Sequence, residues 1–184
     1  MRCCFIANRR LITVGCVTVL LLFGLGFGIN YHLNTGSNLY VPEIEQKARA
    51  SQNVPDSWTS VSETTENVAA VLMYDGETNE HNFVVYSKSI DAQTDNSFSI
   101  IAGGTIPSNR FDIAELYSDD FDEYIYVSMN RQKACLLQIT MDSKFSTVQI
   151  DPDKPFVIIL SQRNGEITFY DKNDQLIQYD TFKL

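Results

Sequence analysis

The sequence predicts an all-β fold, an antiparallel β-sandwich of jelly-roll or immunoglobulin-like type, with one N-terminal transmembrane helix. An uncharged apolar run occupies residues 11–29. From residue 68 onward, short apolar runs alternate with turn residues roughly every ten positions, which is typical of sandwiches and barrels. Cys135 is the only cysteine after the apolar run, so an intradomain disulfide is excluded and core packing has to stabilise the domain.

The apolar run reads LITVGCVTVLLLFGLGFGI. A helix that crosses a bilayer needs about 20 mostly apolar residues. Arg2, Arg9 and Arg10 precede the run, whereas residues 30–41 contain no Lys or Arg. Because positive residues stay on the cytoplasmic side, we expect a cytoplasmic tail at 1–10, a signal anchor at 11–29 and an extracytoplasmic remainder.

Two other interpretations of this run remain. Cleavage after Gly28 would release the remainder, since Gly26 and Gly28 are small enough for a signal-peptide cleavage site. A lipoprotein signal at Cys16 is disfavoured, because Thr13 occupies a position where Leu is preferred and the apolar run continues past the cysteine.

The stretch 30–57 is expected to be a juxtamembrane linker with a short helix. Within it, VPEIEQKARA at 41–50 has Pro42 at a suitable first helical position, acidic residues early and Lys47 and Arg49 late. This charge order suits the helix dipole. A lone tryptophan at a linker edge usually belongs to the neighbouring core, so Trp58 marks the expected start of the β-sandwich domain, 58–184.

The domain is predicted to contain strands that pair antiparallel with their sequence neighbours. The run VIIL at 157–160 is apolar on both faces, as in a central strand. The turn residues Asn164 and Gly165 are typical of a hairpin. The predicted strands cover residues 68–74, 82–87, 98–102, 111–117, 123–129, 133–140, 145–150, 156–160, 166–170 and 175–181.

Charge is distributed unevenly along the chain. The net charge is −9, but all 23 acidic residues and only 11 of the 14 Lys and Arg follow residue 30, which gives −12 beyond the apolar run. Such a domain is repelled by nucleic acid and by anionic bilayers. We therefore expect contact with the membrane only through 11–29, no nucleic-acid partner, and a possible protein or glycan partner for the outer domain.

No catalytic, cofactor-binding or metal-binding constellation is recognisable in the sequence. The histidines are His32 and His81, too few for a zinc site with a single outer cysteine. No serine lies in a nucleophile elbow. The chain is therefore expected not to be an enzyme. The alternative is an envelope hydrolase that uses His81 and the acidic loop 119–123, whose acids are Asp119, Asp120, Asp122 and Glu123. This loop lacks the spacing and glycine of a calcium-binding EF-hand and is better explained as a solvated turn.

Tyrosines are frequent in the predicted strands. If several shared one exposed face, they would form a surface for a glycan or protein partner. Cross-strand packing explains them equally well and is the favoured interpretation. The tyrosines concerned are Tyr74, Tyr86, Tyr124, Tyr126, Tyr170 and Tyr179.

Several segments together resemble a group of uncharacterised small signal-anchored extracellular β-domain proteins of Gram-positive bacteria. The segments are VAAVLMYDGETNEHNFVVY, the pair Gly103 and Gly104, YVSMN, DKPFVIIL and YDKNDQLIQ, which lie within 68–178. The resemblance implies an extracellular β domain at a Gram-positive cell surface and assigns no functional residues. With the features above, it favours a non-enzymatic binding or interaction module at the cell envelope.

Overall fold

The computed structural model describes residues 41–88, 98–106, 111–118, 121–142, 144–161 and 165–184. The expected tail, signal anchor and first part of the linker lie outside these residues. Within the described residues, none of the helical structure is sufficiently long and apolar to traverse a bilayer.

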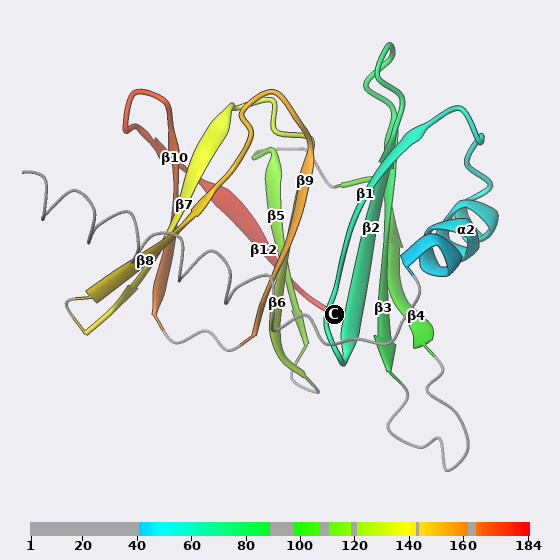
Figure 1. Cartoon of the computed structure of the whole chain (residues 1–184), viewed down its shortest axis with the longest axis horizontal. Helices are drawn as coiled ribbons and strands as arrows, with labels where there is room; N and C mark the ends of the chain where they lie inside the picture. The colour runs from blue at the N-terminus through cyan, green and yellow to red at the C-terminus, as the bar shows by residue number, and fades with distance from the viewer. Residues whose placement is uncertain (1–40, 89–97, 107–110, 119–120, 143, 162–164) are drawn as a thin grey trace, which may run out of the picture. The chain divides into compact units, whose positions relative to one another are not determined.

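The described chain is mostly β, with one helix and three four-stranded sheets (Figure 1). We call the sheets A (order β1-β2-β3-β4), B (β12-β5-β6-β9) and C (β11-β10-β7-β8). The elements are α2 (Val41–Gln52), β1 (Thr59–Thr64), β2 (Val68–Tyr74), β3 (His81–Lys88), β4 (Phe98–Gly104), β5 (Ile113–Ser118), β6 (Phe121–Ser128), β7 (Ala134–Met141), β8 (Lys144–Gln149), β9 (Phe156–Ser161), β10 (Glu166–Asp171), β11 (Leu176–Ile177) and β12 (Tyr179–Lys183).

The all-β prediction is confirmed, with two differences in the strands. β1 was not predicted, because its sequence TSVSET has a single aliphatic residue and pairs with the fully apolar β2. The predicted strand 175–181 is divided at Gln178 into β11, which pairs with β10 in sheet C, and β12, which pairs with β5 in sheet B. The β12–β5 pair is parallel, in contrast to the expected antiparallel pairing of sequence neighbours.

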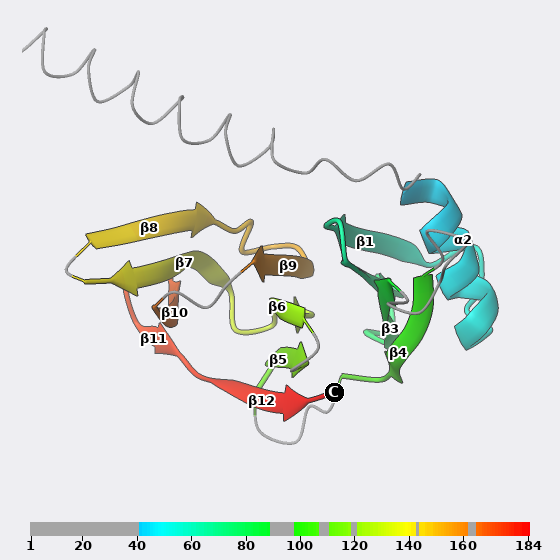
Figure 2. The same ribbon diagram turned by 90° about the horizontal axis from the view of Figure 1, so that it is seen from below.

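Sheet B packs against another sheet on each of its faces, as the view in Figure 2 shows. Alternation along β5 illustrates this, since Ala114 and Leu116 belong to the core shared with sheet A, whereas Ile113 belongs to the core shared with sheet C. The chain also passes repeatedly between B and C: β6 is followed by β7 and β8 in C, then β9 in B, then β10 and β11 in C, then β12 in B. Sheet A, by contrast, is formed by four consecutive strands.

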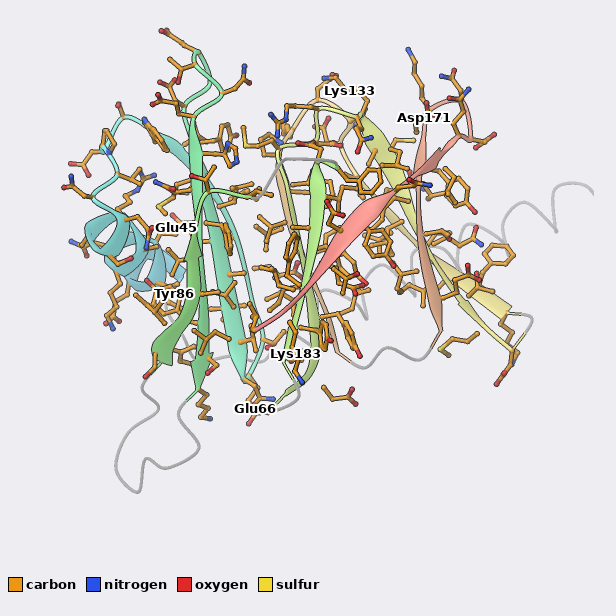
Figure 3. The ribbon with its side chains drawn as sticks, turned by 180° about the vertical axis from the view of Figure 1, so that it is seen from behind. Glu45, Glu66, Tyr86, Lys133, Asp171 and Lys183 are labelled. Atoms are coloured by element: carbon orange, nitrogen blue, oxygen red, sulfur yellow. The ribbon has the colours of Figure 1, made fainter. Side chains whose placement is uncertain are left out.

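Helix α2 covers the other face of sheet A. Ile44 and Ala48 are buried against residues of β2 and β3. Glu45, labelled in Figure 3, accepts hydrogen bonds from the hydroxyls of Ser60 and Ser62 on β1. The short helix expected within 30–57 is therefore present, and the packed core extends back to residue 44.

Candidate functional site

His81 and Glu123, which the structure describes among the residues of the hydrolase alternative, lie apart. His81 begins β3 opposite Tyr74, at one end of the β2–β3 pair, and its Nδ1 lies 3.0 Å from the carbonyl oxygen of Asn79. Glu123 instead accepts a 3.0 Å hydrogen bond from Thr65, which precedes β2 at the other end of sheet A. At about 3.3 Å per residue, the length of β2 separates the two ends by about 20 Å.

The rest of the acidic loop is described only in part. Asp119 and Asp120 lie outside the described residues, and Asp122 is exposed. Among the described residues, no three His, Cys, Asp or Glu side chains come together as metal ligands would.

The tyrosines serve mainly in packing. Tyr126 is fully buried, and Tyr86 is 4% exposed beneath α2. Tyr126 meets Phe169 and Tyr179 edge to face, with ring centroids 5.3 Å and 5.8 Å away. Tyr124 stacks on Tyr117 at 6.0 Å. Cross-strand packing, the favoured interpretation, is seen for Tyr124 against Tyr117, whereas Tyr86 packs beneath α2 and Tyr126 and Tyr179 pack in the core between sheets B and C.

A groove lies where the chain leaves sheet C for sheet B. Its volume is about 400 Å³. Sequence patterns did not predict it, because it arises from the division of the strand 175–181 at Gln178. The groove is lined by Phe111, Glu166, Ile167, Thr168, Leu176, Ile177, Gln178 and Tyr179.

The β10–β11 turn holds one side of the groove in place. The Asp171 carboxylate accepts hydrogen bonds from the backbone N–H groups of Gln175, at 2.9 Å, and Asn173, at 2.7 Å. These hydrogen bonds hold the pKa of Asp171 below its usual value, and the bond from Gln175 has the largest effect. The turn presents Leu176, which is 57% exposed, at the groove.

The opposite wall is supported by a buried polar network. The Tyr179 ring packs edge to face on Phe169 and Tyr126. Tyr126 donates a 2.5 Å hydrogen bond to the fully buried carboxylate of Glu115, which also accepts one from Thr181 at 3.2 Å. A single acid within an apolar strand gave no indication in the sequence that it would lie behind a groove.

The groove has the composition of a binding site. Five apolar or aromatic side chains line it together with Glu166, Thr168 and Gln178. Apolar walls with a few polar groups are typical of ligand sites.

Two further carboxylates lie where sheet A meets sheet B. Glu63 on β1 accepts a 2.9 Å hydrogen bond from the backbone N–H of Ile159 on β9. Burial raises the pKa of Glu63 to about 7, and the Ile159 bond opposes this increase. Burial likewise raises the pKa of Glu123, the Thr65 hydroxyl opposes the increase and the charge of Glu66 adds to it. These acids join two sheets and do not line the groove.

No family model, curated protein or solved structure matches this chain.

Proposed function

We propose that this chain is a membrane-anchored, non-enzymatic binding module at the cell envelope, and that the groove beside β10, β11 and β12 is its ligand site. The groove carries the proposal. It combines apolar walls, three polar side chains and a volume of about 400 Å³, which suits a small ligand or part of a larger one. The partner would be a protein or a glycan.

The anchor and its orientation are part of the proposal. The uncharged run 11–29, with three arginines before it and a net charge of −12 after it, supports a single span with the N-terminus in the cytoplasm. We also propose that sheets A and B form the two layers of a jelly-roll or immunoglobulin-like sandwich to which sheet C is added.

Photocrosslinking tests the groove. The full chain, in its native membrane, would carry p-benzoylphenylalanine at Leu176 or, as a control, at Ile100. The two positions are matched, since Leu176 is 57% exposed and Ile100 49%. We expect a crosslinked product from position 176 that position 100 does not give. The same products from both positions, or none from position 176, would contradict the proposed site.

Cysteine labelling of intact cells tests the anchor. In a chain that contains Glu77→Cys and in which Cys135 is replaced by Ala, a membrane-impermeant maleimide should label position 77 and leave Cys3 and Cys4 unmodified. Glu77 is exposed in the β2–β3 turn, so labelling there requires no unfolding. Labelled protein in the membrane fraction supports the anchor. Labelled protein in the medium would show cleavage, and an unlabelled position 77 would refute the orientation.

A further inference from the structure

The edge strands of the described sheets differ in how they are protected from pairing with another chain. Unprotected edges attract other strands, and proteins protect them with bulges, charges or short strands. The edge strands β1 and β9 lie against each other, and the backbone N–H of Ile159 on β9 donates a hydrogen bond to the Glu63 carboxylate on β1. The pairing of β4 with β3 contains a bulge, β11 has two residues, and β12 carries Asp180 and Lys183.

Strand β8 has less of this protection, since its one charged residue is Lys144 at the first position. Its six residues pair with β7 in an unbroken register, and five of them are exposed. The backbone N–H of Ile150 donates to the carbonyl oxygen of Cys135, next to β7. Because backbone groups alternate sides along a strand, the N–H and C=O groups of Phe145, Thr147 and Gln149 face away from β7.

The β7–β8 hairpin also exposes large apolar side chains and has no net charge. Phe145 is 71% exposed and Met141 is 44% exposed. Residues 134–149 carry Asp142 and Lys144, hence no net charge, in a chain whose outer part carries −12. Two copies would repel each other across most surfaces of such a domain, and least at this hairpin.

We propose that β8 pairs antiparallel with β8 of a second copy, so that the two C sheets become one continuous sheet across a two-fold axis. The sequence of β8 is compatible with pairing to itself. With the axis at Ser146, Lys144 faces Val148 of the partner, and with the axis at Thr147 it faces Ile150. Neither register places like charges opposite each other, which would be destabilising.

This dimer leaves the proposed ligand site open. The groove borders β11, at the opposite edge of sheet C from β8. A dimer would therefore carry two grooves, one at each end of the joined sheet. A ligand with two binding units, held by both grooves, would bind more tightly than one unit does alone.

Disulfide trapping tests the pairing in the purified full chain in detergent. The background is a variant of the chain in which Cys3, Cys4 and Cys16 are replaced by Ser and Cys135 is replaced by Ala. Ser146→Cys and Thr147→Cys would each be introduced separately into this variant. Residues that face themselves across an antiparallel pair have Cα atoms about 4.5–5.5 Å apart, which a disulfide spans. We expect at least one variant to form a covalent dimer several-fold more efficiently than the control, Ser99→Cys on the exposed edge strand β4. Equal yields would overturn the proposal.

A proline variant separates strand pairing from chance collision. Thr147→Pro removes a backbone donor that faces away from β7, so the β7–β8 ladder keeps its hydrogen bonds. The proline is combined with whichever cysteine crosslinks. With Ser146→Cys the proline replaces Thr147, and with Thr147→Cys it replaces Gln149. The crosslink should fall to the Ser99→Cys level while the circular dichroism spectrum and thermal midpoint stay close to those of the parent.

Persistence of the crosslink in the folded proline variant would overturn the dimer. If the proline variant unfolds, Phe145→Lys provides the second test. In a dimer this substitution places two added positive charges near the two-fold axis, so the crosslink should decrease. An undiminished crosslink would then contradict the proposal. Photocrosslinking from Leu176 reports on the groove separately, so failure of the dimer and failure of the proposed function give different results.

Discussion

The two faces of sheet B are packed in different ways. The face toward sheet A is aliphatic, with Leu116, Ile125 and Ile159 among its buried residues, and two carboxylates lie at its border. The face toward sheet C is rich in aromatic rings and encloses Glu115, which accepts hydrogen bonds from two hydroxyls. This fold accommodates buried acids by two means. Hydroxyl donors surround the fully buried acid, whereas Glu63, with one backbone donor, has a pKa raised to about 7.

The aromatic face should be the more sensitive to truncation. Phe169 is fully buried and contacts the rings of Tyr126, Phe156 and Tyr179. Phe169→Ala should lower the free energy of unfolding by about 3–5 kcal/mol, because it leaves a cavity among these rings. Urea unfolding followed by circular dichroism measures this loss. Leu72→Ala, in the aliphatic core, is the matched variant, and a larger loss there would reverse the comparison.

The buried network should be the next most sensitive feature. Glu115→Ala removes the carboxylate that accepts the hydrogen bond of the buried Tyr126 hydroxyl, at a cost of about 1–3 kcal/mol. A double-mutant cycle with Tyr126→Phe should show a coupling energy of about 0.5–3 kcal/mol. Strictly additive losses would mean that this hydrogen bond contributes nothing to stability.

The border between sheets A and B should respond to pH. The pKa of Glu63 is 4.5 in the unfolded reference and about 7 in the fold. The folded chain thus binds the extra proton, and this contribution to stability is complete below pH 4.5 and is lost as the pH rises through 7. The loss is at most about 3 kcal/mol, and smaller to the extent that water reaches the side chain.

Glu63→Gln cannot ionise, so between pH 4.5 and 7 its unfolding free energy should fall less steeply than that of the parent. Urea unfolding at a series of pH values measures the difference. Glu77→Gln, in the exposed β2–β3 turn, is the control and should keep the parental slope. A parental slope in Glu63→Gln would exclude Glu63 as the source of the pH dependence.

The exposed phenylalanine should have the smallest effect. Phe145→Ser removes a ring that is 71% exposed, and surface substitutions usually change stability by less than about 0.5 kcal/mol. Thermal unfolding of dilute protein measures this change. A loss comparable to that of Phe169→Ala would show that the β7–β8 hairpin belongs to the core.

Local patterns in the sequence predicted most of the elements but not their assembly. β2 and β9 were recognisable because their apolar runs are bounded by turn residues, and α2 because of its proline and charge order. β1 has a polar sequence and depends on its partner β2. The pairings β6–β9 and β7–β10 join segments distant in the chain, and no local pattern encodes them.

The candidate site was beyond sequence reasoning for the same reason. Leu176 and Tyr179 belong to one predicted strand, and the groove exists because the chain changes sheets between them. His81 and the acidic loop attracted attention by their composition, yet His81 lies at one end of sheet A, whereas Glu123 on β6 contacts Thr65 at the other end.

The route of the chain has a consequence for how the molecule assembles. Strands β5 to β12 pass between sheets B and C four times, so these two layers cannot separate as independent pieces, whereas β1 to β4 are contiguous and reach the rest through one covalent connection. The molecule is thus divided into an autonomous meander and an interlaced pair of layers. Co-expressed fragments 1–106 and 107–184 should associate into the native structure, whereas a break between β8 and β9 should abolish assembly.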